Sequence, residues 1–288
     1  MIKSIFLAVL LSTTSAFAVI GGIVAKPGEF AASVFVQEAH CSAVMIREDL
    51  LLLAGHCVNA RAEETKLQVG FQLHIVSTAF ESGRPKIYKA SIVNLESHPL
   101  WIKALKKTND PNIAMMDDDQ TLDLAVMQLD AKLPMAAAKL PRRAKIFADY
   151  ENITFLVTGF GCDVDQGLPI ESLKYFSVPL MSAVDGKWRY RFSTNETQTT
   201  KICGGDSGSA LYDERDPQTV LGINSGAASS LGIAARIDKV AAQVWLRQYL
   251  QTPVAKLIAP EVDLEKEKEE KRITEQLKSV GLRKNPSL

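Results

Sequence analysis

Apolar residues along most of the chain occur in short bursts, separated by turn-forming or charged residues. From residue 19 to about residue 240 the bursts include SVFVQ, SAVMI, LLLLAG, KLQVGF, LHIVS, DLAVMQL, ITFLVTGFG, YRFS and TVLGINSG. Short strands at this spacing are typical of an all-β sandwich or barrel rather than of alternating β and α units. A stretch of roughly 220 residues is long enough for two small β-barrels packed together.

The apolar pattern changes near the end of the chain. In DKVAAQVWLRQYLQ (238–251), Val240 and Val244 stand at helix-like spacing, which predicts one C-terminal helix that ends before Pro253. Residues 253–288 are a mixed-charge tail with only a sparse apolar stripe. The charges favour a solvated tail, helical or disordered, and a helix that docks on a partner is the alternative.

Composition and charge limit the function classes. Of 288 residues, 47% are hydrophobic and 23% charged, with a formal net charge of zero, which indicates a globular protein rather than a disordered one. No cluster of Lys and Arg alternates with aromatic residues, so nucleic acid is not an expected partner.

The first residues, MIKSIFLAVLLSTTSAFA, have one Lys, a short apolar run and small residues up to Ala18. This pattern predicts a signal peptide over residues 1–18 and an exported protein, extracellular or periplasmic. A membrane anchor is the alternative reading, but the run is much shorter than the roughly 20 residues that span a bilayer. We therefore expect no stable membrane insertion.

Four cysteines, Cys41, Cys57, Cys162 and Cys203, would enter an oxidising compartment after export. An even number there favours two disulfides, and three pairings are possible on paper. A zinc site is the competing interpretation, but no pair has the short C-x-x-C spacing common in such sites. We expect disulfides, and neither a metal nor an organic cofactor.

Three residues offer the parts that acyl transfer needs: a nucleophile, a base and an acid to hold the base. Ser207 lies in GGDSGS, where glycines leave the backbone free to expose a side chain. His56 ends the apolar run LLLAGHC, and Asp123 opens the apolar run of TLDLAVMQL, where an unpaired carboxylate would be costly. Each residue alone also fits a structural role in a turn, a core or a cap.

Together, and in the order His, Asp, Ser, these motifs resemble those of the chymotrypsin/trypsin-like serine proteases. VIGG (19–22) is similar to the mature N-terminus of that family, VTGFG (157–161) to the start of its second barrel, and VWLRQYL to its terminal helix. The resemblance covers residues 19 to 251 and implies a secreted, bacterial-type member with two six-stranded antiparallel β-barrels and a C-terminal helix. The implied domain spans 19–252, with a first barrel at about 19–135 and a second at about 136–240.

The resemblance implies a role for each matched residue. Ser207 would attack the scissile carbonyl, His56 would take its proton, and Asp123 would hold the imidazole, while the N–H groups of Gly205 and Ser207 would form the oxyanion hole. It also implies an ion pair between the new amine of Val19 and Asp206. Signal peptidase would release that amine directly; cleavage after Ala16 is the alternative.

The family pattern also implies the disulfides. Cys41 and Cys57 pair in the family, whereas the usual downstream partner of Cys203 is absent here. Cys162 is then the one cysteine left for it. We therefore predict a Cys162–Cys203 bridge.

Lys201, six residues before Ser207, stands at the expected floor of the primary specificity pocket. Like charges repel in a desolvated pocket, which argues against cleavage after Lys or Arg. Two alternatives stay open: a preference for Glu or Asp, or an apolar pocket from which Lys201 extends outward. The expected pocket residues are Lys201, Ile202, Ser225, Ala227 and Gly232.

The segment between residues 102 and 120 is longer than its family counterpart, and we expect it to overhang the cleft beside Asp123 or to be a plain surface insertion. The sequence as a whole predicts a serine endopeptidase that acts on proteins or peptides and can meet protein inhibitors. The alternative is a catalytically silent protein of the same fold that binds proteins.

Overall fold

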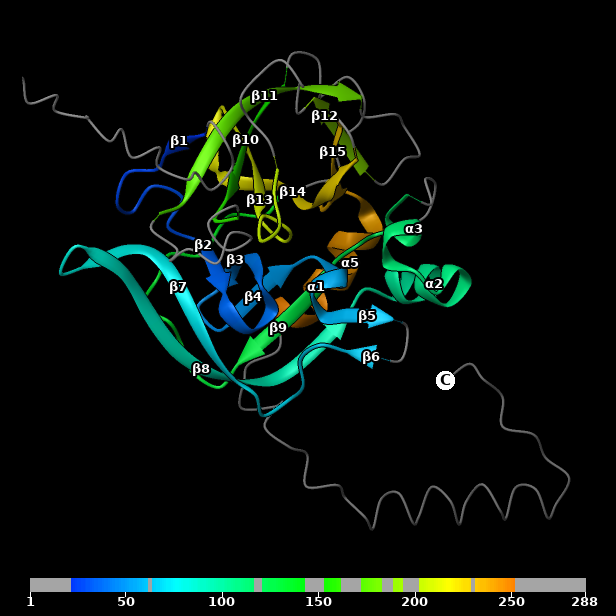
Figure 1. Cartoon of the computed structure of the whole chain (residues 1–288), viewed down its shortest axis with the longest axis horizontal. Coiled ribbons are helices and arrows are strands. Elements are labelled where there is room, and N and C mark those ends of the chain that lie inside the picture. Colours follow the sequence, from blue (N-terminus) through cyan, green and yellow to red (C-terminus); the bar gives the residue numbers. More distant parts are fainter. Residues whose placement is uncertain are drawn as a thin grey trace, which may run out of the picture. The chain divides into compact units, whose positions relative to one another are not determined.

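The computed structural model describes eight ranges of the chain: 22–61, 64–116, 121–142, 153–161, 172–182, 189–193, 202–228 and 231–251. Within them the protein folds into two antiparallel β-barrels with few helices (Figure 1). The all-β prediction is therefore confirmed, with six strands in each closed barrel. The described residues up to Leu246 belong to one compact unit.

The first barrel has the strand order β2-β3-β4-β9-β8-β7 and closes through pairing of β2 with β7. Its strands are β2 (Ser33–Val36), β3 (Cys41–Arg47), β4 (Leu50–Leu53), β7 (Gln72–Glu81), β8 (Arg84–Ser97) and β9 (Ala125–Leu129). All four leucines of β4 are fully buried, as are Ala125 and Met127 of β9. A strand buried on both faces needs a continuous apolar run, which explains the sequence LLLL.

The second barrel has the order β11-β10-β13-β14-β15-β12 and closes through pairing of β12 with β11. Its strands are β10 (Thr154–Gly159), β11 (Lys174–Ser182), β12 (Arg189–Ser193), β13 (Ala210–Asp213), β14 (Asp216–Ala228) and β15 (Leu231–Arg236). Its core is rich in aromatic residues, including Phe155, Tyr190 and Phe192.

The short strand β1 (Ile23–Val24) pairs with β11 of the second barrel. The expected range of the first barrel, 19–135, therefore includes two residues that lie on the second. A two-residue strand has too little pattern to indicate its partner from sequence.

The remaining elements are short. They are the 3-10 helix η1 (Gln37–Ala39), α1 (Gly55–Val58), the paired strands β5 (Asn59–Arg61) and β6 (Glu64–Thr65), α2 (Pro99–Thr108), α3 (Pro111–Met116) and α5 (Val240–Leu250). The segment expected as a loop after residue 102 thus carries helices α2 and α3. Helix α5 matches the predicted C-terminal helix. In the described ranges, no helix combines the length and the apolar character needed to cross a membrane.

Candidate active site

His56 and Asp123 meet at one end of two paired strands. β4 and β9 run antiparallel with Leu53 opposite Ala125, so the residues that follow β4 lie beside those that precede β9. The carboxylate of Asp123 accepts from the backbone N–H of His56 at 2.8 Å and lies 2.7 Å from its Nδ1. A carboxylate only accepts, so Nδ1 carries the proton and Nε2 of the neutral ring is left as a proton acceptor.

The burial of this pair differs between its members. The Asp123 side chain is 2% exposed, whereas the His56 side chain is 15% exposed. Both carboxylate oxygens of Asp123 are engaged by the same residue, which satisfies a buried charge and fixes both the imidazole orientation and its tautomer.

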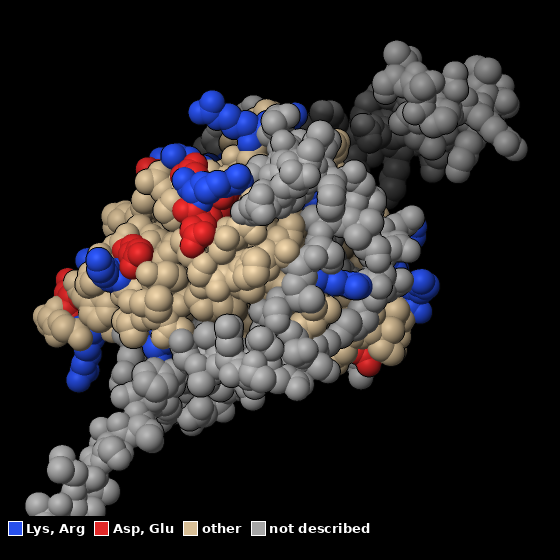
Figure 2. Space-filling view, turned by 90° about the horizontal axis from the view of Figure 1, so that it is seen from above, with Lys and Arg blue, Asp and Glu red and all other residues tan. Residues whose placement is uncertain are grey.

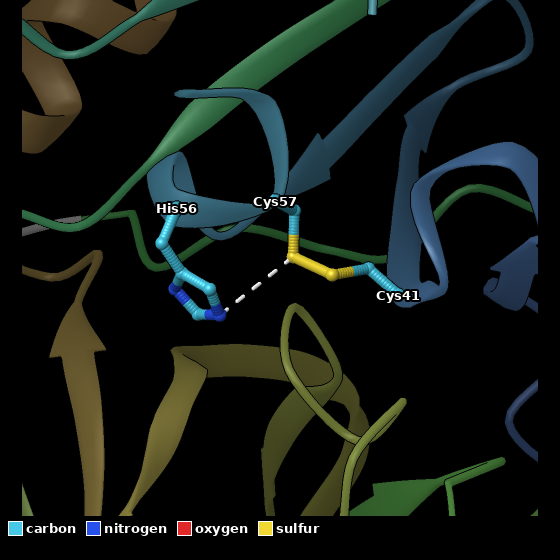
Figure 3. A group of neighbouring side chains, drawn as sticks. All are labelled: Cys41, His56 and Cys57. Carbon is cyan, nitrogen blue, oxygen red and sulfur yellow. Dashed lines mark hydrogen bonds between the residues drawn. A yellow bond between two sulfur atoms is a disulfide. The ribbon is translucent and has the colours of Figure 1, made fainter. Parts of the chain in front are cut away.

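A disulfide between Cys41 and Cys57 links helix α1 to strand β3. Figure 3 shows the His56 ring beside it, with Nε2 3.9 Å from Cys57 Sγ. The donor atoms of Cys41, His56 and Cys57 lie within 4.8 Å of one another, a spacing that a metal ion would accept. Both sulfur atoms are joined in the disulfide, however, so neither is available as the thiolate that a metal would need. The expected Cys41–Cys57 pairing is confirmed.

The loop that carries Ser207 is fixed to both barrels. The carbonyl oxygen of Gly205 accepts from the N–H and from the hydroxyl of Ser42 on β3, at 2.9 and 2.8 Å. On the other side, the N–H of Gly208 donates to the carbonyl of Asn224 on β14 at 2.8 Å. Gly205 and Gly208 have φ values of +92° and +84°, which glycine alone adopts without cost.

Ser207 lies half-buried on this loop, between the buried residues Asp206 and Gly208. A Cβ atom built on Gly208, the next residue, would meet Ser42 and the backbone N of Ala54, which stands two residues before His56. The loop and α1 are therefore neighbours. Among the described residues, no hydrogen bond joins Ser207 Oγ to His56 Nε2.

Asp206 is 1% exposed, and among the described residues its carboxylate accepts from two backbone N–H groups. The donors are the N–H of Gly161 at 2.8 Å and the N–H of Cys203 at 2.9 Å. Its expected partner, Val19, lies outside the described residues, as does Lys201. Cys203 is disulfide-bonded, and its expected partner Cys162 also lies outside them.

The other expected pocket residues have different surroundings. Ser225 is buried and Ala227 is exposed, while Ile202 packs against the core of the second barrel. Gly232 lies against the ring of Phe192, so a side chain there would overlap it. Ala227 pairs directly with Gly232, which makes this stretch a tight β14–β15 hairpin.

Sequence reasoning missed the contacts of α2 and α3 with the site. Trp101 is fully buried and lies against Gly55, directly before His56. A Cβ on Gly226 would lie 3.9 Å from Met115 Sδ, so α3 reaches β14. The available signal was Pro99 at a helix start, followed by Trp101 and Leu105 four residues apart.

The described surface mixes charges of both signs. Figure 2 shows blue and red side chains beside one another on one face. Among the described residues, ion pairs such as Lys132–Glu48 and Lys86–Glu81 join exposed charges of opposite sign. The described part of this face therefore has no single-sign field that would favour a polyanion.

Comparisons with known proteins agree with this architecture. The family model described as Trypsin matches residues 19–244. A mutant of human heparin binding protein (CAP37) is similar in structure, with 19% identity and a TM-score of 0.58 over 81% of this chain and 97% of that chain. An atomic-resolution structure of HBP gives 18% identity, a TM-score of 0.58 and the same coverage. At such identities the structural likeness supports the fold alone.

Proposed function

The chain belongs to the trypsin family, and from this premise we propose that it is an exported, bacterial-type serine endopeptidase. The observation that carries the proposal is the double hydrogen bond between His56 and Asp123. A buried carboxylate that fixes one tautomer of a partly exposed imidazole is what a general base for a hydroxyl needs. The nucleophile would be Ser207.

In the proposed reaction, Ser207 Oγ attacks the scissile carbonyl carbon while its proton moves to His56 Nε2. Asp123 stabilises the imidazolium that forms, and the N–H groups of Gly205 and Ser207 stabilise the oxyanion. The imidazolium then protonates the leaving amine, and an acyl-enzyme forms. Water, deprotonated by the same imidazole, hydrolyses that ester and restores the hydroxyl.

The anchoring of the Ser207 loop supports this proposal. Because Ser42 fixes the carbonyl of Gly205 with two hydrogen bonds, the peptide units around it are oriented before substrate binds. Oxyanion donors stabilise charge best when they need no rearrangement. The proposed ion pair of Asp206 with the amine of Val19 would hold the same loop from its other side.

We propose that the substrates are proteins or peptides and that cleavage does not follow Lys or Arg. Lys201 at the pocket floor would favour Glu or Asp, or would turn outward and leave an apolar pocket. A peptide library digested by the protein distinguishes these outcomes. Cleavage confined to bonds after Lys or Arg would contradict both.

Labelling with a fluorophosphonate tests the proposal directly, because this probe forms a covalent bond to an activated serine. We expect labelling of the wild type and its loss in Ser207→Ala. Ser209→Ala is the matched control, because Ser209 lies two residues along the same loop, is 2% exposed, and its hydroxyl has no hydrogen-bond partner among the described residues. Equal labelling of wild type and Ser207→Ala would contradict the proposed nucleophile.

A catalytically silent binding protein is the second candidate function. One observation favours it: no hydrogen bond links His56 Nε2 to Ser207 Oγ in the described part of the chain. The same labelling experiment distinguishes the two candidate functions, because a silent protein would not be labelled as wild type, as Ser207→Ala or as Ser209→Ala. The likeness to heparin binding protein, at 19% identity, does not add heparin as a partner here.

A further inference from the structure

Three consecutive residues of α1 are each held by a different part of the protein. Cys57 is joined to β3 by the disulfide with Cys41, and His56 is held by Asp123. Gly55 lies against the indole of Trp101 on α2. The first two restraints belong to the site already described. The third comes from α2, whose function the proposed reaction leaves unassigned.

The contact between Gly55 and Trp101 is too close for any side chain at position 55. A Cβ built on Gly55 would lie 2.5 Å from Cδ1 and 2.8 Å from Cγ of Trp101. The backbone itself does not require glycine there, because Gly55 is the first residue of α1 and lies outside the left-handed region. The glycine therefore makes room for the indole.

The surroundings of Trp101 hold its side chain in place. It is fully buried in a small cluster with Ala104, Leu105 and Ala114, against which Met115 also packs. Its ring meets the imidazole of His56 edge-on, with centroids 6.4 Å apart and an interplanar angle of 65°. Its Nε1 has no hydrogen-bond partner among the described residues, although a buried donor without a partner is costly.

We propose that Trp101 is a positioning residue for His56 and acts through its fit against Gly55. The indole closes the side of α1 that neither Asp123 nor the disulfide restrains, and it thereby keeps the imidazole aligned with the carboxylate. The inference rests on the proposed role of His56 as the base. It gives helices α2 and α3 a function in the reaction, because the cluster that they form contains the indole.

A double-mutant cycle tests the fit. Gly55→Ala forces the indole and α1 apart, and we expect kcat to fall about 10- to 100-fold with little change in KM, the size of loss that a misplacement of about 1 Å can cause. Trp101→Leu removes both the clash and the restraint on His56, so this single variant should also lower kcat about 10-fold with little change in KM. In that background we expect Gly55→Ala to cost less than about threefold, a clear departure from additivity.

A purely structural role for Trp101 predicts a different result, because Trp101→Leu would then lower the unfolding midpoint but leave kcat unchanged. Leu73→Ala is the control for a loss of stability, because Leu73 is fully buried on β7 and lies outside the cluster that contains Trp101. We expect Leu73→Ala to lower the unfolding midpoint while leaving kcat within about threefold of wild type. Additive effects of Gly55→Ala and Trp101→Leu, an unchanged kcat in Trp101→Leu, or a kcat loss in Leu73→Ala equal to that in Gly55→Ala, would overturn the proposal.

A second readout separates this inference from the proposed function. The proton on His56 Nδ1, hydrogen-bonded to Asp123, can be followed by NMR in Ser207→Ala, where no hydrolysis occurs. We expect its signal in that background, and its loss or displacement on adding either Gly55→Ala or Trp101→Leu. An unchanged signal with Gly55→Ala would refute the positioning role even if the wild type hydrolyses peptides. Absence of hydrolysis by the wild type, with the signal responding as expected, would refute the proposed function alone.

Discussion

Asp123 holds His56 at two points, since one carboxylate oxygen accepts from the backbone N–H and the other lies 2.7 Å from Nδ1. The first bond places the turn that carries the residue, and the second orients its ring. Because both come from one buried side chain, the position of the backbone and the direction of Nε2 are coupled. This coupling suits a base that must meet a hydroxyl from another part of the chain.

Replacing Asp123 by Asn tests this coupling. An amide has only one accepting atom, so it cannot accept from both His56 groups, and an amide N–H next to Nδ1 favours the wrong tautomer. We expect kcat to fall about 10⁴-fold, as is typical when a catalytic Ser–His–Asp triad loses its carboxylate, while KM changes little.

Steady-state kinetics on a peptide or ester substrate measure this effect. Asp213→Asn is the control, because Asp213 is equally an acid with 6% exposure and pairs with Arg215 away from α1. It should alter stability but leave kcat unchanged. A kcat for Asp123→Asn within tenfold of wild type would rule out the proposed role of the carboxylate.

Gly208→Ala should eliminate fluorophosphonate labelling. Its φ of +84° disfavours any side chain, and a Cβ there would overlap the carbonyl oxygen of Ser42. Gly83→Ala separates the two effects, because Gly83 has a similar φ of +79° but open space around it. That control should lose only about 1–2 kcal/mol of unfolding free energy and keep full labelling. Equal labelling of the two variants would show that the close approach to Ser42 does not matter.

The Cys41–Cys57 disulfide should contribute to both stability and activity. It closes a loop with a sequence separation of 16, for which chain entropy predicts about 3 kcal/mol. We expect Cys41→Ala/Cys57→Ala to lower the unfolding free energy in urea by about that amount and to reduce kcat. A reducing agent should lower the unfolding free energy of this variant less than it lowers that of wild type. A variant with unchanged unfolding free energy would contradict the prediction.

Much of the fold could be predicted because its signals are local. The run LLLL before His56 and the run AVMQL after Asp123 mark two buried strands, and their antiparallel pairing brings the two side chains together. The C-terminal helix was also predicted, but Val240 and Val244, whose spacing indicated it, are exposed, and the buried residues of α5 include Ala242, Trp245 and Leu246.

The contacts that sequence reasoning missed are those between distant residues. Gly55 and Trp101 are 46 positions apart, and nothing at either position indicates that an indole will fill the space above that glycine. Met115 and Gly226 are even further apart, on α3 and β14. Sequence reasoning did not predict helix α2, because its lysines interrupt the spacing of its apolar residues. The two-residue strand β1 has no pattern of its own.

His98 should make the protein less stable in mild acid. The residue is buried, its Nδ1 accepts from the N–H of Leu100 at the start of α2, and burial lowers its pKa from 6.5 to about 4. Below pH 6.5 the unfolded chain therefore binds a proton that the folded protein does not, so the unfolding free energy decreases as the pH falls from 6.5 to 4. The full decrease is about 3 kcal/mol. Urea unfolding at pH 7 and pH 4.5 measures it, with His98→Asn as the matched variant, because Asn keeps an acceptor for Leu100 without titrating. We expect the difference between the two pH values to shrink by about 2–3 kcal/mol in His98→Asn, and an unchanged difference would assign the acid sensitivity to other groups.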